Sequence, residues 1–282
     1  MDRRRFLAAA GVTGVGLGAT AAASSEAMAA PGGSDAATMN FLLNLEYLQS
    51  EFYSRATTGT GLPDDLIGGV GVVGPITGGR AMTFGDPTLE TFAHAFAFDE
   101  RCHVELLRDS LGPAVVARPA MDFDTGFTAL TLAAGLTQPG EPFDAFADDQ
   151  SFLLSAYVIE DVGVTAYRGA ISSLANREYV DTAAGILGVE AYQAGFVRTA
   201  LFTMGLQRSA DSISAARGRL SGGADEGFDI GMAISFAPAD DAAMVFARSP
   251  GQVLNVLYVN PGVARFGGFY PAGVNGELAT SG

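Results

Sequence analysis

The stretch Glu46-Tyr-Leu-Gln-Ser-Glu-Phe-Tyr53 decides the fold of this chain, together with Glu100-Arg-Cys-His103 further along. The pattern recurs as Glu160-Asp-Val-Gly-Val-Thr-Ala-Tyr167, followed by Glu190-Ala-Tyr-Gln193. Each copy reads Glu-x6-Tyr and then Glu-x-x-His or Glu-x-x-Gln, with every glutamate on an apolar helical face. Carboxylates are rarely buried unless they are paired or hold a metal. The repeat therefore predicts a four-helix bundle around a dinuclear metal site.

Helical geometry explains these spacings. Seven residues bring a side chain back to within about 20° of its starting direction, so Glu46 shares a face with Tyr53, and Glu160 with Tyr167. Three residues place His103 about 60° from Glu100 and one turn along, so both can reach one metal ion. Without a metal, four buried acids would have to take up protons or draw in arginines.

Apolar periodicity and capping residues divide the chain into elements. The predicted helices cover residues 37–57, 86–111, 148–175 and 176–207, and residues 37–208 form the bundle. The glycine-rich loop 59–85 is a lid or a surface excursion, and residues 113–147 form a long crossover without clear periodicity. Residues 209–282 are expected to be an extension of turns and short elements packed on the bundle, with a short helix at Val253–Tyr258.

The N-terminus has the pattern of an export signal. Three arginines, Arg3 to Arg5, precede an apolar run from Ala8 to Ala23, and the small residues Ala27-Met28-Ala29 follow it. A charged start, an apolar run and a small-residue cleavage site predict a signal peptide at residues 1–29, followed by a linker at 30–36. The paired arginines resemble a twin-arginine (Tat) signal, so we expect export to the periplasm or the extracellular space. The run is too short for a stable membrane span.

Composition narrows the class of function. The chain has 282 residues, 48% of them apolar, a mean hydropathy of +0.25 and a net charge of −15. Every basic residue is an arginine. The acidic balance argues against nucleic acid as a partner, since phosphates need a basic face. The lone cysteine, Cys102, cannot form an intramolecular disulfide.

Several motifs in order resemble the ferritin-like superfamily, and within it the desiccation-related protein family. The matching stretches are Asn40–Leu48, Glu51–Tyr53, Asp99–Val104, Tyr157–Gly169, Val189–Tyr192, Gly195–Arg198, Ser249–Tyr258 and Gly267–Pro271. The resemblance covers nearly all of the chain after the signal. It implies an all-α, ferritin-like four-helix bundle with a long crossover and a C-terminal extension.

The resemblance also implies a centre of one or two iron or manganese ions. Its implied metal ligands are Glu46, Glu100, His103, Glu160 and Glu190. Position 193 would carry histidine in the family pattern, and Gln193 stands there instead, as a weaker ligand that puts the second ion in doubt. Asp99 is placed where such proteins often have an acid that orients the histidine at that position.

Five other side chains near the motifs have competing interpretations. Glu51 lies about 140° from Glu46 and is expected to be a solvated charge. His94 is out of register with Glu100, so we expect a surface or packed histidine. Cys102 is interpreted as a small core residue. Tyr53 and Tyr167 are either hydrogen-bond partners of the ligands, redox-active phenols, or packing residues.

Two main hypotheses for function remain open on the sequence alone. The first is an exported metalloprotein that handles peroxide, oxygen or the metal itself. The second is a non-catalytic stress-protective or structural protein that keeps the bundle without a working dinuclear centre. A weaker third makes the glycine- and aromatic-rich tail a partner-binding surface with the bundle as its scaffold.

Overall fold

A computed structural model describes residues 34–223, 225, 227–228 and 235–282. The predicted signal peptide and most of the linker lie outside these residues. The longer elements are α2 (Asp35–Thr58), α3 (Pro87–Leu111), α4 (Phe123–Ala133), α5 (Asp149–Ile171), α6 (Arg177–Thr203), α7 (Gln207–Ser221) and α8 (Pro250–Leu257). The shorter ones are the 3-10 turns η1 (Asp64–Leu66) and η2 (Gly112–Ala114) and the strands β1 (Ile76–Thr77) and β2 (Met121–Asp122).

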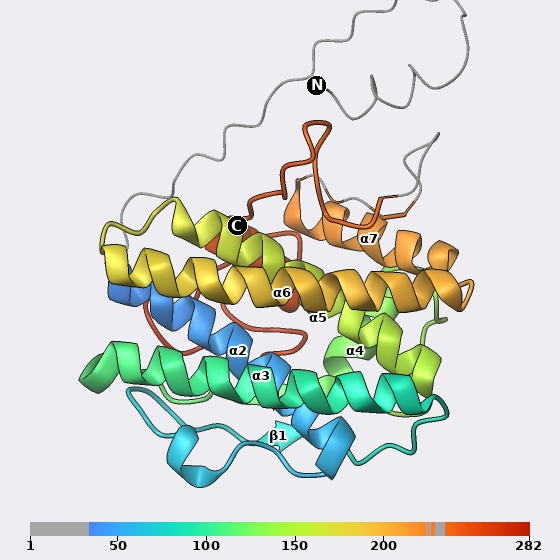
Figure 1. The fold of residues 1–282 in the computed structure, drawn as a ribbon, viewed down its shortest axis with the longest axis horizontal. Helices are drawn as coiled ribbons and strands as arrows, with labels where there is room; N and C mark the ends of the chain where they lie inside the picture. The colour runs from blue at the N-terminus through green and yellow to red at the C-terminus, as the bar shows by residue number, and fades with distance from the viewer. Residues whose placement is uncertain (1–33, 224, 226, 229–234) are drawn as a thin grey trace, which may run out of the picture.

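Four long helices form the bundle, as the sequence predicts. α2 packs most extensively against α3, and α5 against α6, while α2 and α5 also contact each other. Figure 1 shows α3 and α6 running across one side of the molecule, with α2 and α5 behind them. The crossover between α3 and α5 is the long connection expected from the sequence. The all-α bundle is therefore confirmed.

The ends of these helices follow the expected capping rules. Asp86 accepts a hydrogen bond from Thr88 at the start of α3, with Pro87 at the first helical position. Asp148 and Asn176 cap α5 and α6 in the same way. Side-chain oxygens thus satisfy backbone N–H groups that have no partner inside the helix.

Residues 113–147, expected to be a long crossover without clear periodicity, contain the helix α4. Asp122 caps α4 by accepting from the Thr125 amide, and the helix buries Phe123 and Phe127 against Phe52 of α2. The sequence of α4 is short and carries apolar residues on most sides, so its periodicity is weak. Tertiary packing against Phe52 accounts for a helix that the pattern alone does not indicate.

The predicted end of the fourth helix, and the absence of a long helix after it, were also wrong. α6 ends at Thr203, where Gly205 turns the chain with a φ of 76°, and α7 then begins at Gln207. α7 has few apolar residues, so it gives little amphipathic signal. Its buried face includes Arg217, which is fully inaccessible to solvent.

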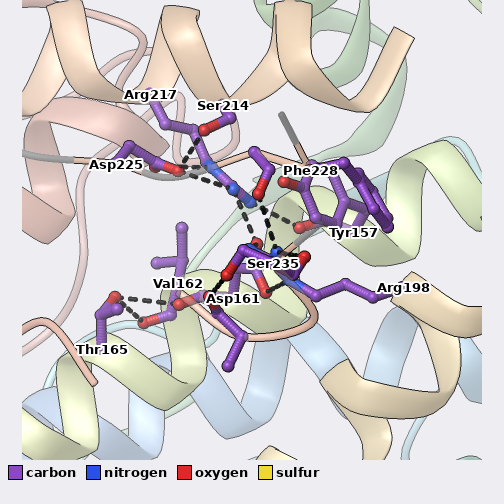
Figure 2. Close-up of polar contacts among 12 residues, drawn as sticks. Tyr157, Asp161, Val162, Thr165, Arg198, Ser214, Arg217, Asp225, Phe228 and Ser235 are labelled. Atoms are coloured by element: carbon purple, nitrogen blue, oxygen red, sulfur yellow. Dashed lines mark hydrogen bonds and ion pairs between the residues drawn. The ribbon is translucent and has the colours of Figure 1, made fainter. Parts of the chain in front are cut away.

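Arg217 belongs to a buried network of five charged residues, and Figure 2 shows four of them: Asp161, Arg198, Arg217 and Asp225. Asp161 of α5 accepts hydrogen bonds from Arg198 of α6 and Arg217 of α7, each at 2.7 Å. Asp225 accepts from Arg217 at 2.9 Å and from Arg248 at 2.6 Å. The guanidinium of Arg217 also lies 4.4 Å from the centroid of the Tyr157 ring. The network ties α7 and the segment before α8 to the bundle.

A second ion-pair cluster fixes the 59–85 loop, and here the prediction for Glu51 was wrong. Glu51 is fully buried rather than solvated. It pairs with Arg118 at 2.5 Å and with Arg55 at 2.9 Å, and Arg118 donates to the Gly74 carbonyl oxygen. Because a buried carboxylate needs such partners, Glu51 attaches the loop to α2. The strand pair of β1 and β2 adds a second attachment between loop and crossover.

The C-terminal tail packs along α2. The Tyr270 hydroxyl donates to the Asn44 carbonyl oxygen at 2.8 Å, and the Asn275 side chain donates to the carbonyls of Val72 and Ala117. The short helix expected at Val253–Tyr258 is present as α8, which begins with a capping box of Ser249 and Gln252. Within the described residues, no helix is both long and apolar enough to cross a membrane.

Candidate metal centre

The four motif glutamates come from the four bundle helices and are all completely buried. Glu46 lies on α2, Glu100 on α3, Glu160 on α5 and Glu190 on α6. His103 follows Glu100 by one turn and is 7% exposed. The apolar faces predicted from the repeat are therefore turned inward, with one carboxylate from each helix.

Four of the predicted ligands form one compact group, called here the four-ligand cluster: Glu46, Glu100, His103 and Glu190. Their ligand atoms all lie within 4.8 Å of one another. His103 Nδ1 is 3.2 Å from Glu46 Oε2, 3.6 Å from Glu100 Oε2 and 4.0 Å from Glu190 Oε1. One ring nitrogen thus faces three carboxylates from three helices.

Of the two remaining predicted ligands, the carboxylate Glu160 is not part of this cluster, and Gln193 is an amide. Gln193 lies one turn after Glu190 on α6 and is 2% exposed. Glu160 is fully buried, and its charge contributes to raising the pKa of Glu190, after burial and Glu100. Glu160 is therefore close to the cluster.

Each of the two motif tyrosines donates a hydrogen bond to the glutamate of the other copy of the repeat. Tyr53 of α2 donates a 2.5 Å hydrogen bond to Glu160 Oε1 of α5, and Tyr167 of α5 donates to Glu46 Oε1 of α2. Both tyrosines are fully buried. Of the interpretations offered by the sequence, their placement matches that of hydrogen-bond partners to the carboxylates. These bonds fix the orientation of Glu46 and Glu160.

Sequence reasoning missed two residues that shape the site. Gln49, 2% exposed, donates from Nε2 to Glu190 Oε2 at 3.0 Å. Gly163 of α5 lies beside the same oxygen, since a Cβ built on it would be 2.2 Å from Glu190 Oε2 and 3.2 Å from Gln49 Nε2. Both stand three residues after a motif glutamate, at the spacing of His103 and Gln193. That spacing is a signal that could have identified them.

Burial controls the protonation of the cluster. Loss of hydration raises the pKa of Glu100 and Glu190 well above the ordinary range, and the neighbouring carboxylates raise them further. Burial raises the pKa of Glu160 to about 8, against hydrogen bonds that lower it. Burial would lower the pKa of His103, but Glu46 and Glu100 raise it to about 12. Without a cation, the cluster holds protons that a cation would replace.

The donor set fits a divalent cation. Both oxygens of Glu100, Oε2 of Glu160, Oε1 of Glu190 and both polar side-chain atoms of Gln193 are buried without a hydrogen-bond partner among the described residues. Buried polar atoms are normally bonded, so this concentration at one place needs an explanation. Carboxylates with one imidazole suit iron or manganese. A cation at the four-ligand cluster would satisfy the free oxygens of Glu100 and Glu190.

The other sequence candidates lie outside the cluster. Asp99 is half-buried and makes no hydrogen bond or ion pair to a cluster residue in the described part of the chain. His94 is exposed, so of the two alternatives expected for it, surface or packed, it is a surface histidine. Cys102 was predicted as a core residue, but it is only half-buried, because it lies on the flank of α3 beside the buried face.

Comparison with known proteins identifies the fold and two relatives. Residues 34–203 match the family model described as a ferritin-like domain. A ferritin-like catalase, Nec2, of Nesocodon mauritianus is 28% identical over 262 residues, covering 86% of this chain and 83% of that protein. The desiccation-related protein PCC13-62 of Craterostigma plantagineum is 32% identical over 182 residues, covering 64% of this chain and 56% of that protein. No solved structure matches.

Proposed function

Since this chain belongs to the ferritin-like domain family, we propose that its four-ligand cluster binds iron or manganese and serves the handling of oxidant or of the metal. The observation that carries the proposal is His103 Nδ1 facing three buried carboxylates from three helices. The relative named as a ferritin-like catalase supports peroxide as the oxidant. The export expected from the signal-like N-terminus remains part of the proposal, with the periplasm or the extracellular space as its destination.

The residues of the site have three different roles. Glu46, Glu100, His103 and Glu190 would hold the cation, which would supply reversible electron transfer when bound. Tyr53 and Tyr167 orient the carboxylates of Glu160 and Glu46 by hydrogen bonds. Burial raises the pKa of Glu160 to about 8 in the metal-free site, so this carboxyl group can hold a proton there when no cation is bound.

The burial of the site restricts what can react there. Every motif glutamate is completely inaccessible, and His103 is only 7% exposed. Such a closed site favours a reactant of the size of peroxide or dioxygen over a large organic substrate. In a catalase reaction one peroxide is reduced to water while a second is oxidised to dioxygen, so no other co-reactant is needed.

A non-catalytic, stress-protective function is the second candidate. Gln193 stands where the family pattern has histidine, and neither of its polar side-chain atoms has a partner among the described residues. The desiccation-related relative supports this alternative. In this case the bundle would persist as a stable scaffold, with or without a bound ion.

Dioxygen release from hydrogen peroxide separates the two candidates. Protein loaded with Mn²⁺ or Fe²⁺ should evolve dioxygen. In His103→Ala the rate of dioxygen release should be at least about tenfold lower, because the substitution removes the only imidazole ligand. Tyr270→Phe, which alters a buried hydroxyl away from the cluster, serves as the control. Metal-loaded protein that evolves no dioxygen, and whose melting temperature does not respond to metal, would favour the scaffold function.

A further inference from the structure

The two copies of the repeat differ at the position three residues after the motif glutamates Glu46 of α2 and Glu160 of α5. Glu46 is followed by Gln49 and Glu160 by Gly163. Both positions face Glu190, since Gln49 Nε2 bonds Glu190 Oε2 and a Cβ on Gly163 would collide with the same atom. The bare backbone of Gly163 therefore makes the room in which the Gln49 amide and the Glu190 carboxylate meet.

The two oxygens of Glu190 consequently have different surroundings. Oε1 lies 4.0 Å from His103 Nδ1 and has no hydrogen-bond partner among the described residues, so it is free to bind an ion in the four-ligand cluster. Oε2 accepts the amide of Gln49 at 3.0 Å. A carboxylate that bridges two ions gives one oxygen to each. Here the second oxygen is already bound to an N–H donor.

The Gln49 amide also faces the remaining acid on that side. Its nitrogen lies against α5 one turn after Glu160, since a Cβ on Gly163 would be 3.2 Å from Gln49 Nε2. The amide nitrogen carries two N–H donors and no acceptor, so its positive end is turned toward carboxylates. A cation at this place would meet the same positive end, and the amide cannot turn its oxygen inward without breaking its bond to Glu190.

We propose that Gln49 makes this centre mononuclear, because its amide occupies the oxygen of Glu190 that a second cation would need. The inference rests on the proposed metal centre and concerns how many ions that centre holds. One cation binds at the four-ligand cluster, and the amide replaces the second. Gln193 then has no second ion to bind.

Titration with Mn²⁺ alone, followed by metal analysis and electron paramagnetic resonance, tests this. Wild-type full-length protein should bind about one ion per chain, with the spectrum of an isolated ion, rather than the two expected of a dinuclear bundle. Gln49→Leu removes the donors at similar volume and should take up about two ions with an exchange-coupled spectrum. If circular dichroism shows that the Gln49→Leu variant does not fold, Gln49→Met, which keeps the unbranched shape of glutamine, is titrated in its place.

Gln193→His is the matched comparison, since it restores the imidazole of the family pattern and leaves Gln49 in place. It should still bind about one ion. A coupled pair of ions in wild type, a second ion in Gln193→His alone, or a single ion in Gln49→Leu and Gln49→Met would each overturn the assignment to Gln49. Wild type that binds no Mn²⁺ at all would instead contradict the metal centre itself.

Discussion

Tyr53 on α2 donates a 2.5 Å hydrogen bond to Glu160 on α5, and the reciprocal bond runs from Tyr167 on α5 to Glu46 on α2. The pair of bonds joins the two copies of the repeat across the bundle. Each phenol has a pKa well above its ordinary value, because burial and then the neighbouring carboxylate oppose its ionisation. The tyrosines therefore remain protonated donors over the whole accessible pH range.

Removing the Tyr167 hydroxyl should weaken metal binding. Tyr167→Phe leaves Glu46 without its donor, so we expect the affinity for Mn²⁺ to fall by about tenfold or more, as for other residues that orient a ligand. Calorimetric titration measures this. Tyr270→Phe removes an equally buried hydroxyl that bonds the Asn44 carbonyl oxygen. It should lower stability by about 1–3 kcal/mol and leave the affinity unchanged. Equal affinity in both variants would contradict the orienting role.

The metal-free protein should become less stable as the pH rises from about 5 to 8. Burial raises the pKa of Glu160 from 4.5 to about 8, and the carboxylates around His103 raise its pKa from 6.5 to about 12, against the effect of burial. Both shifts make the folded state bind more protons than the unfolded chain in this interval, so the free energy of unfolding falls with rising pH. Thermal melting in chelator measures the slope.

Added Mn²⁺ should make the decrease in the free energy of unfolding with rising pH smaller, because a bound cation takes the place of the protons. Melting curves at the same pH values, with and without Mn²⁺, provide the comparison. A melting temperature of the metal-free protein that rises between pH 5 and 8 would contradict the protonation state derived for the cluster.

Gly163→Ala should disrupt the site, because the added Cβ would lie 2.2 Å from Glu190 Oε2. The Glu190 carboxylate must move, and we expect Mn²⁺ affinity to fall by at least about tenfold. Gly188→Ala is the control on α6, since nothing lies within 4 Å of its added Cβ. That change should stabilise the helix by about 0.5–1 kcal/mol. Wild-type affinity in Gly163→Ala would show that the close approach has no role.

The buried charge network should dominate the attachment of α7. Asp161→Ala leaves Arg198 and Arg217 without their shared carboxylate in the interior, and we expect a loss of about 3–5 kcal/mol in the free energy of unfolding. Asp144→Ala removes the same group from an exposed pair with Arg80, and should cost at most about 1 kcal/mol. Denaturant unfolding of both variants measures the difference. Equal losses would contradict the assignment.

The sequence predicts the bundle well because its helices carry strong local signals. Glutamates on apolar faces, the Asp86-Pro87 start and the Asn176 cap each determine structure within a few residues. α4 and α7 depend instead on distant partners, Phe52 for α4 and the Asp161 network for α7. Their own patterns are weak, so the long-range contacts that stabilise them cannot be read from short windows.

The site was predictable in part for the same reason. Helical register identified the carboxylates and the position of His103. The burial of Glu51 depends on Arg118, 67 residues away, so its angle on the helix gave the wrong environment. Gln49 was overlooked because glutamine on a helix is usually solvated, although its spacing from Glu46 equals that of His103 from Glu100. The bond to Glu190 becomes visible only once α2, α5 and α6 are packed together.

Anomalous diffraction from crystals loaded with Mn²⁺ tests the metal centre most directly. We expect an anomalous peak within coordination distance of Glu46, Glu100, His103 and Glu190. We expect no such peak in crystals of His103→Ala grown with the same metal. Crystals that diffract well, contain the folded bundle and show no anomalous peak among these four residues would contradict the account.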